Sequence, residues 1–119
     1  MNFDSTRVKI DLDAISANFD AIAAKARVPV MAVVKADAYG HGAIQISRKL
    51  ESLGVDYLAV SSLDEARELR HGGIEAPILI LGHTPPEMVP QLIEHGITQT
   101  VSARAKAEEY SAAAQTCGG

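Results

Sequence analysis

The sequence lacks several features that mark other classes of protein. Its 119 residues include one cysteine, Cys117, so no disulfide can form within the chain and no cysteine-rich metal cluster is expected. A single cysteine also fits a reducing compartment. No apolar run approaches the roughly 20 residues that cross a bilayer, and the N-terminus has neither the basic nor the apolar region of a signal peptide. We therefore expect a cytoplasmic protein without a membrane partner.

Concentrated charge and common catalytic motifs are also absent. The 15 acidic and 11 basic residues are dispersed along the chain, which gives no basic footprint for nucleic acid. The four histidines lack the spacing of a metal site, and the chain has no P-loop, G-x-S-x-G or Cys–His nucleophile pattern. We expect no metal site and no nucleic-acid partner, which leaves a small neutral or zwitterionic ligand open.

Short apolar runs rich in β-branched residues are what the sequence does contain. They occupy residues 30–34, 57–60, 78–81 and, more weakly, 97–101. Continuous apolar runs are typical of strands buried on both faces of a parallel sheet, and the intervals leave room for one crossover helix each. Residues 8–12 instead alternate between polar and apolar, which predicts an additional strand with one wet face.

Helix signals fill the intervals between these runs. Ser62 and Glu65 fit a capping box, and so do Thr84 and Glu87, with Pro85 predicted at the first helical position. Glycines are plausible stops for three helices. Before the first apolar run, Asp13 can cap a helix. A last helix is predicted over residues 103–114, and an apolar stripe predicts another that buries Ile46, Leu50 and Leu53.

Repeated strand and helix units predict a parallel α/β sheet, either doubly wound or curled into a (β/α)8 barrel. A whole barrel needs about 250 residues, and this chain has room for about four units. If the sheet is a barrel, residues 1–119 therefore make about half of one, and we expect the chain to be truncated. A half-barrel has two open edges and an apolar inner face, which predicts self-association.

Lys35 follows the first predicted strand, at the edge where parallel α/β sheets place their ligands. A desolvated amine is more readily neutral, and can then act as a base or as a nucleophile toward an aldehyde. Position alone nevertheless favours an ordinary surface lysine. Tyr39 follows in a loop with Gly40 and Gly42, where the backbone can approach a ligand and a phenol can bind a phosphate.

Residues 32–43, AVVKADAYGHGA, closely resemble the pyridoxal-phosphate attachment motif of bacterial alanine racemases. The resemblance extends to residues 10–15, 63–66 and 73–82, and so covers most of the chain up to about residue 100. It implies an eight-stranded α/β barrel followed by a mostly β domain, assembled as a head-to-tail homodimer. Residues 1–119 would be the N-terminal part of that barrel, and the strand at residues 8–12 would belong with the second domain.

The resemblance also implies roles for individual residues. Lys35 would hold pyridoxal phosphate as an aldimine and act as one of two bases that move the α-proton of an amino-acid substrate. Tyr39 would contact the cofactor phosphate, and Leu81 would line the pocket beside the cofactor ring. Asp37 stands where the family often has asparagine, and no catalytic role attaches to it.

Other parts of the family's active site have no counterpart in residues 1–119. They are the second base, which is a tyrosine from the partner subunit, the arginine that pairs with the pyridine nitrogen, and most of the phosphate cradle. We therefore expect a parent protein that interconverts L- and D-alanine and a 119-residue chain that is inactive alone. A serine racemase of the same family, a non-catalytic cofactor-binding barrel and a scaffold that binds nothing stay open as alternatives.

Overall fold

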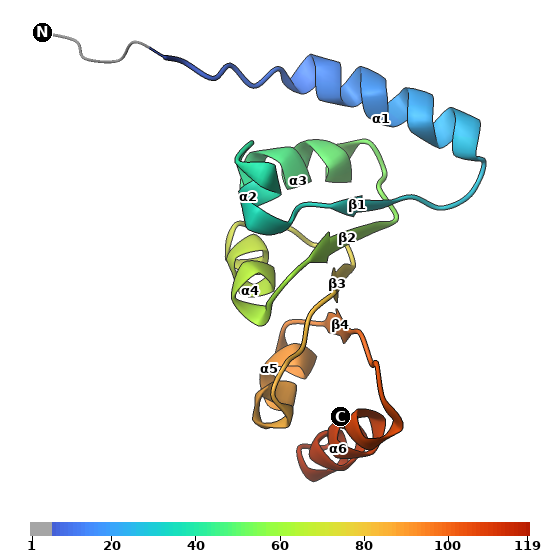
Figure 1. The fold of residues 1–119 in the computed structure, drawn as a ribbon, viewed down its shortest axis with the longest axis vertical. Coiled ribbons are helices and arrows are strands. Elements are labelled where there is room, and N and C mark those ends of the chain that lie inside the picture. The colour runs from blue at the N-terminus through green and yellow to red at the C-terminus, as the bar shows by residue number, and fades with distance from the viewer. Residues whose placement is uncertain (1–5) are drawn as a thin grey trace, which may run out of the picture.

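The computed structural model describes residues 6–119 as one parallel sheet with helices packed against it (Figure 1). The strands are β1 (Met31–Val33), β2 (Tyr57–Val60), β3 (Ile78–Ile80) and β4 (Ile97–Gln99), paired in the order in which they occur in the chain. Each pair is parallel, with Met31 opposite Tyr57 and Ile78 opposite both Leu58 and Ile97. A doubly wound sheet reverses its strand order, so this sequential order is that of a partial barrel.

Helices connect the strands and flank both ends of the sheet. In chain order, they are α1 (Leu12–Ala26), α2 (Lys35–Tyr39), α3 (Ala43–Ser52), α4 (Leu63–His71), the short 3-10 helix η1 (Pro86–Met88), α5 (Val89–Glu94) and α6 (Arg104–Thr116). All four strands form where apolar runs predict them, although three are shorter than predicted. None of these helices, within residues 6–119, is long and apolar enough to cross a membrane.

The core lies between one face of the sheet and the connecting helices. Leu58, Ile78 and Ile80 are completely buried on that face and pack in one apolar cluster with residues of α3, α4 and α5. On the opposite face, the side chains of Met31 and Val33 keep 43% and 39% of their surface exposed. The uncovered face is therefore exposed at β1, whereas Ala59 of β2 on the same face is buried.

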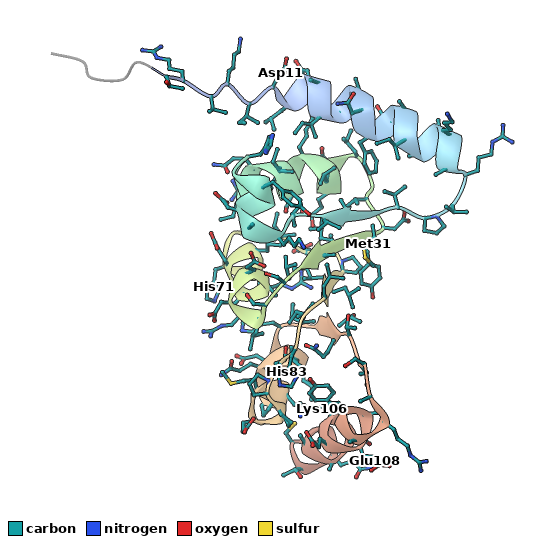
Figure 2. All side chains as sticks on the ribbon, viewed as in Figure 1. Asp11, Met31, His71, His83, Lys106 and Glu108 are labelled. Carbon is teal, nitrogen blue, oxygen red and sulfur yellow. The ribbon has the colours of Figure 1, made fainter. Side chains whose placement is uncertain are left out.

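The segment before α1 is not the strand that its alternating pattern predicts. Residues 8–11 are not in a strand, Leu12 already belongs to α1, and no strand of the described chain pairs with this segment. The prediction of a strand at residues 8–12 is therefore wrong, because an alternating pattern needs a neighbouring strand to bond with. The cap of α1 is Asp11, labelled in Figure 2, whose carboxylate accepts from the backbone N–H groups of Asp13 and Ala14 at 3.0 and 3.2 Å. Asp13 lies in the first turn instead.

The two predicted capping boxes have different outcomes. Ser62 caps α4 as predicted, since its hydroxyl accepts from the Glu65 N–H at 3.3 Å. Thr84 does not cap a helix, because its buried hydroxyl donates to the Gln99 side chain on β4. Pro85 consequently precedes η1 and is not the first helical residue.

One arginine side chain links two connections at the amino-terminal edge of the sheet by hydrogen bonds. The guanidinium of Arg70 donates to the carbonyls of Ile74, Ala76, His95 and Gly96 at 2.8 to 3.2 Å. Burial lowers the pKa of Arg70, while the charges of nearby Glu51 and Glu75 act in the opposite direction. Arginine stays protonated in proteins, so this cation links the α4–β3 connection to the α5–β4 connection.

Candidate active site

The carboxyl edge of the sheet brings two of the predicted site residues together. Directly before Lys35, the Val34 N–H donates to the Ala59 carbonyl at 2.9 Å, and the Leu81 N–H donates to the Val60 carbonyl at 2.8 Å. Lys35 and Leu81 therefore leave the sheet on the two sides of β2. Since neighbouring strands lie about 4.8 Å apart, their backbones are roughly 10 Å apart at this edge.

The chain after Lys35 forms a left-handed helical turn, which was not predicted. Ala36, Asp37, Ala38 and Tyr39 have φ angles between +52° and +56°. In this conformation the Cβ atom crowds the following carbonyl, which costs roughly 1–2 kcal/mol for each residue other than glycine. None of the four is glycine, so nothing in the sequence marks the turn. Tyr39 is the last residue of this turn, four residues after Lys35.

Hydrogen bonds stabilise the turn from inside and outside. Within it, the Ala38 N–H donates to the Val34 carbonyl at 2.9 Å, and His41 Nδ1 lies 3.0 Å from the Ala38 carbonyl oxygen. The Asp37 carboxylate reaches forward and accepts from the Ala43 N–H, the first residue of α3, at 2.7 Å. Asp37 therefore has a structural role as the cap that α3 otherwise lacks.

Glu65 connects the turn to the end of β2. Its Oε2 accepts from the Ala36 N–H at 2.7 Å, and its Oε1 accepts from the N–H of Ser61 at 2.7 Å and from the Ser61 hydroxyl. Burial acts to raise the pKa of the Glu65 carboxyl, but these hydrogen bonds outweigh it and leave the pKa below its ordinary value. The sequence pattern indicates Glu65 only as part of a capping box and carries no signal of this contact with the turn.

The three predicted site side chains are accessible to a ligand. Lys35 is half-buried, while Tyr39 and Leu81 are 60% and 43% exposed. Both ion pairs of the described chain lie in α6, so no carboxylate of residues 6–119 neutralises Lys35. Within residues 6–119, no hydrogen bond joins the side chains of Lys35 and Tyr39, although both residues belong to α2.

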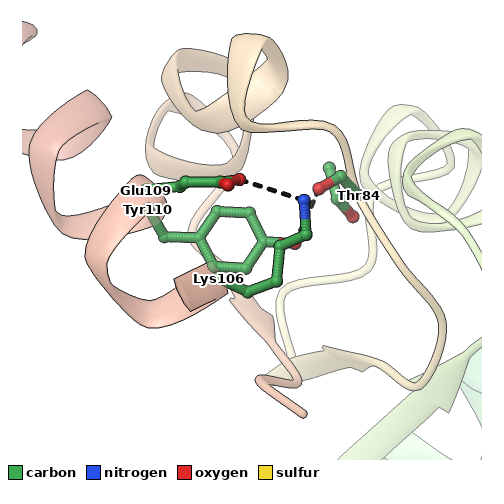
Figure 3. A network of polar contacts seen from close by, with 4 residues as sticks. All are labelled: Thr84, Lys106, Glu109 and Tyr110. Atoms are coloured by element: carbon green, nitrogen blue, oxygen red, sulfur yellow. Dashed lines mark hydrogen bonds and ion pairs between the residues drawn. The ribbon is translucent and has the colours of Figure 1, made fainter. Parts of the chain in front are cut away.

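Leu81 borders a small cavity of about 110 Å³ between the end of β3 and α6. Tyr110 and Lys106 of α6 line it; the Tyr110 hydroxyl donates to the Thr84 carbonyl at 2.6 Å, and Lys106 Nζ donates to Glu109 at 3.0 Å (Figure 3). The hydrogen bond with Glu109 raises the pKa of Lys106. Lys106 is thus kept as a cation paired with Glu109.

Histidines do not add a metal centre to this edge. His71 projects from α4, and His83 lies beyond β3 near α5 (Figure 2). Within residues 6–119, no three histidine, cysteine, aspartate or glutamate side chains gather closely enough to hold a metal ion. The three predicted site residues supply an amine, a phenol and an apolar side chain.

The residues of this edge fit part of a pyridoxal phosphate. Lys35 offers an amine without an ion-pair partner among residues 6–119 for its aldehyde, Leu81 an exposed apolar side chain for its ring, and Tyr39 a hydroxyl for its phosphate. The start of α3 is not free to bind the phosphate, because the Asp37 carboxylate already occupies it. The attachment point therefore fits, whereas the phosphate finds only one of the several donors that it needs.

A sequence model of the family described as "Alanine racemase, N-terminal domain" matches residues 10–118. The chain belongs to this family. Alanine racemase 1 of Caldanaerobacter subterraneus subsp. tengcongensis is 50% identical over 106 residues, which cover 85% of this chain and 27% of that protein. The family explains why the racemase resemblance runs through the whole sheet and not only through the lysine motif.

Solved structures of racemases share the fold of this part of the family. An alanine racemase of Clostridium difficile 630 in complex with cycloserine has a TM-score of 0.83 at 37% identity, covering 94% of this chain and 32% of that one. A histidine racemase from Leuconostoc mesenteroides subsp. sake has the same TM-score of 0.83 at 28% identity, covering 90% and 29%. The chain thus spans 27% to 32% of the length of these three proteins.

Proposed function

We propose that this chain supplies the lysine-bearing part of a pyridoxal-phosphate-dependent racemase that interconverts L- and D-alanine. The observation that carries the proposal is the Lys35 amine just after β1, unpaired within the described part of the chain and followed by the left-handed turn with Tyr39. Membership of the alanine racemase family supports it.

Three residues of the chain have distinct tasks in this function. Lys35 would hold the cofactor through its amine and would accept or return the α-proton of the amino acid. Tyr39 would donate a hydrogen bond from its hydroxyl to the phosphate, and Leu81 would supply an apolar contact for the ring. When bound, pyridoxal phosphate supplies an electron sink that makes the α-proton removable.

We propose that residues 1–119 are the N-terminal part of a racemase barrel and do not racemise alanine alone. A two-base reaction needs a second group on the other face of the substrate. The three tyrosines of the chain are Tyr39, assigned to the phosphate, and Tyr57 and Tyr110, whose hydroxyls bond to Thr98 and Thr84. Conversion of L- to D-alanine by the purified chain would refute the proposal of inactivity.

Cofactor attachment tests the proposal directly. Addition of pyridoxal phosphate to the purified chain should give a visible absorbance band that borohydride removes, with the reduced adduct found on Lys35 by peptide mass spectrometry. Lys35→Ala should lose the band, whereas the matched control Lys106→Ala should keep it, because Lys106 is paired with Glu109. A chain that forms no adduct, or forms it equally on its other lysines, contradicts a cofactor function and favours a scaffold.

Activity is tested in a chimera. A protein in which this chain replaces the matching part of the Caldanaerobacter alanine racemase should racemise L-alanine, and Lys35→Ala should abolish that activity. A chimera that binds cofactor on Lys35 but does not racemise favours the non-catalytic barrel.

The choice of substrate is a separate proposal. An alanine racemase and a histidine racemase match this chain with equal TM-scores, so the fold of this part suits more than one amino acid. Alanine is proposed because the family model and the 50% identical relative carry that name. Serine is the alternative, and competing L-alanine with L-serine in the same chimera decides between them.

We also propose that the chain assembles as a homodimer or a higher homo-oligomer. Met31 and Val33 are exposed on the uncovered face, and β1 and β4 are open edges within the described sheet. Sedimentation that shows only monomer at micromolar concentration contradicts this.

A further inference from the structure

Both peptide units that flank Lys35 are hydrogen-bonded. The carbonyl of the unit before it, from Val34, accepts from the Ala38 N–H at 2.9 Å. The N–H of the unit after it, from Ala36, donates to Glu65 Oε2 at 2.7 Å. Since these two units determine the φ and ψ angles of Lys35, they set the direction in which its side chain leaves the sheet.

Glu65 is the side chain from outside the turn that completes this arrangement. Its own backbone is fixed at the start of α4 by the Ser62 hydroxyl at 3.3 Å, and its second oxygen is bound by Ser61, directly after β2. One carboxylate thereby joins the end of β2, the first turn of α4 and the turn after β1. A negative charge is favourable at the start of a helix, which adds to its stability there.

The contact requires a carboxylate and not merely a polar side chain. Glu65 accepts on both oxygens from two separate segments of the chain. Glutamine has one acceptor oxygen and one donor amide, so it cannot replace both sets of bonds. Charge-assisted hydrogen bonds are also stronger than neutral ones.

Strain in the turn gives the contact its consequence. Four consecutive residues in the left-handed region relax readily unless surrounding groups hold them. If the Ala36 N–H loses its partner, the peptide unit after Lys35 is free to rotate, and the amine moves with it.

We propose that Glu65 is a positioning residue for Lys35, acting through the hydrogen bond to the Ala36 N–H. The inference deepens the proposed function and rests on it for the use that is made of the Lys35 amine. The placement of the backbone around Lys35 is independent of that function and is tested separately.

The experiment compares Glu65→Gln with Glu68→Gln in the 119-residue chain. Glu68 is an exposed glutamate of the same helix with no hydrogen bond to its carboxylate in the described chain. Two quantities are measured: hydrogen exchange of the Ala36 amide by NMR, and the ratio of borohydride-trapped pyridoxal phosphate on Lys35 to that on Lys25, an exposed lysine of α1.

Glu65→Gln should speed exchange of the Ala36 amide about tenfold, as expected for the loss of a hydrogen bond to a charged group. It should also lower the Lys35 to Lys25 labelling ratio several-fold, while Glu68→Gln changes neither quantity. Ser61→Ala removes only the hydroxyl donor and should shift both in the same direction by less. If circular dichroism shows that Glu65→Gln is unfolded, Ser61→Ala is the deciding variant. The proposal is then overturned if both Ala36 exchange and the labelling ratio of Ser61→Ala equal those of the wild type.

The outcomes separate the two proposals. Suppose that Lys35 is labelled selectively in the wild-type chain, and that Glu65→Gln shows the same labelling with the Ala36 amide still protected. This result overturns the role of Glu65 and leaves the proposed function standing. Absence of selective labelling in the wild-type chain refutes the proposed function. In that case, faster exchange of the Ala36 amide in Glu65→Gln still supports the hydrogen bond between Ala36 and Glu65, whereas unchanged exchange overturns its positioning role.

Discussion

The two edges of the sheet differ in whether a polar side chain is left without a partner. At the amino-terminal edge, Arg70 and Glu51 are occupied by backbone groups: Arg70 donates to four carbonyls, and Glu51 Oε2 accepts from two N–H groups at 2.7 Å. At the carboxyl edge, Asp37 and Glu65 bind backbone groups, but Lys35 in their midst stays unpaired in the described chain.

This difference separates stability from chemistry. At the amino-terminal edge, side chains that bond to the backbone of the connections favour a rigid sheet. At the carboxyl edge, an unpaired amine beside a strained turn is left available for a ligand. The carboxylates of the carboxyl edge serve to place that amine. Four expected outcomes test this division, from the largest effect to the smallest.

Arg70→Ala should give the largest loss of stability. It removes the partner of four carbonyls in two connections, and we expect the free energy of unfolding to fall by about 2–3 kcal/mol. Urea unfolding of the chain measures the loss. The control Arg104→Ala breaks only an exposed ion pair with Glu108 and should cost less than about 0.5 kcal/mol. Equal losses in both variants would remove the special role of the amino-terminal edge.

Gly82→Ala should destabilise the carboxyl edge. A Cβ atom at Gly82 would lie 2.5 Å from the Ser61 carbonyl oxygen, so the ends of β2 and β3 must separate. We expect a loss of about 1–2 kcal/mol, as for other overpacked sites. Gly72→Ala is the control, because its new Cβ would meet only side-chain atoms, those of Ile44 at 3.0 to 3.1 Å, and no backbone atom. A smaller loss at Gly82 than at Gly72 contradicts the close approach.

Glu65 should make stability depend on pH in the acid range. Because the folded pKa of Glu65 lies below its ordinary value of 4.5, its contribution is complete above that value and disappears as the pH falls through the folded pKa. Screening at a half-exposed group limits it to about 1 kcal/mol. The difference in unfolding free energy between the wild type and Glu65→Gln should therefore shrink on acidification below about pH 4. If this difference in unfolding free energy instead grows on acidification, the hydrogen bonds to the Glu65 carboxylate do not stabilise the fold as proposed.

Lys35→Ala should leave stability almost unchanged. The Lys35 amine has no hydrogen-bond or ion-pair partner in residues 6–119, so we expect a change within about 0.5 kcal/mol in the unfolding free energy. The same variant loses cofactor attachment under the proposed function. A large loss of stability would mean that Lys35 belongs to the structural set of residues, and the two edges would no longer differ.

Local patterns predicted much of the fold. The four strand positions, the Ser62 cap and the site of Lys35 at a strand end follow from apolar runs and from side chains within a few residues. The strand at residues 8–12 and the Thr84 cap failed for one reason. Each depends on a distant partner: a neighbouring strand is absent in the described chain, and Gln99 takes the Thr84 hydroxyl.

The sequence by itself determined which residues can carry chemistry and where the strands that present them run, because periodicity and motifs are local. Only the tertiary structure decided how Lys35 is placed. The left-handed turn contains no glycine within residues 36–39, and its outside support comes from Glu65, 29 residues along the chain from Ala36. Lys35 and Leu81 share one edge because parallel pairing aligns the ends of β1, β2 and β3. Contacts between distant segments cannot be read from local patterns, and here they set the geometry of the amine.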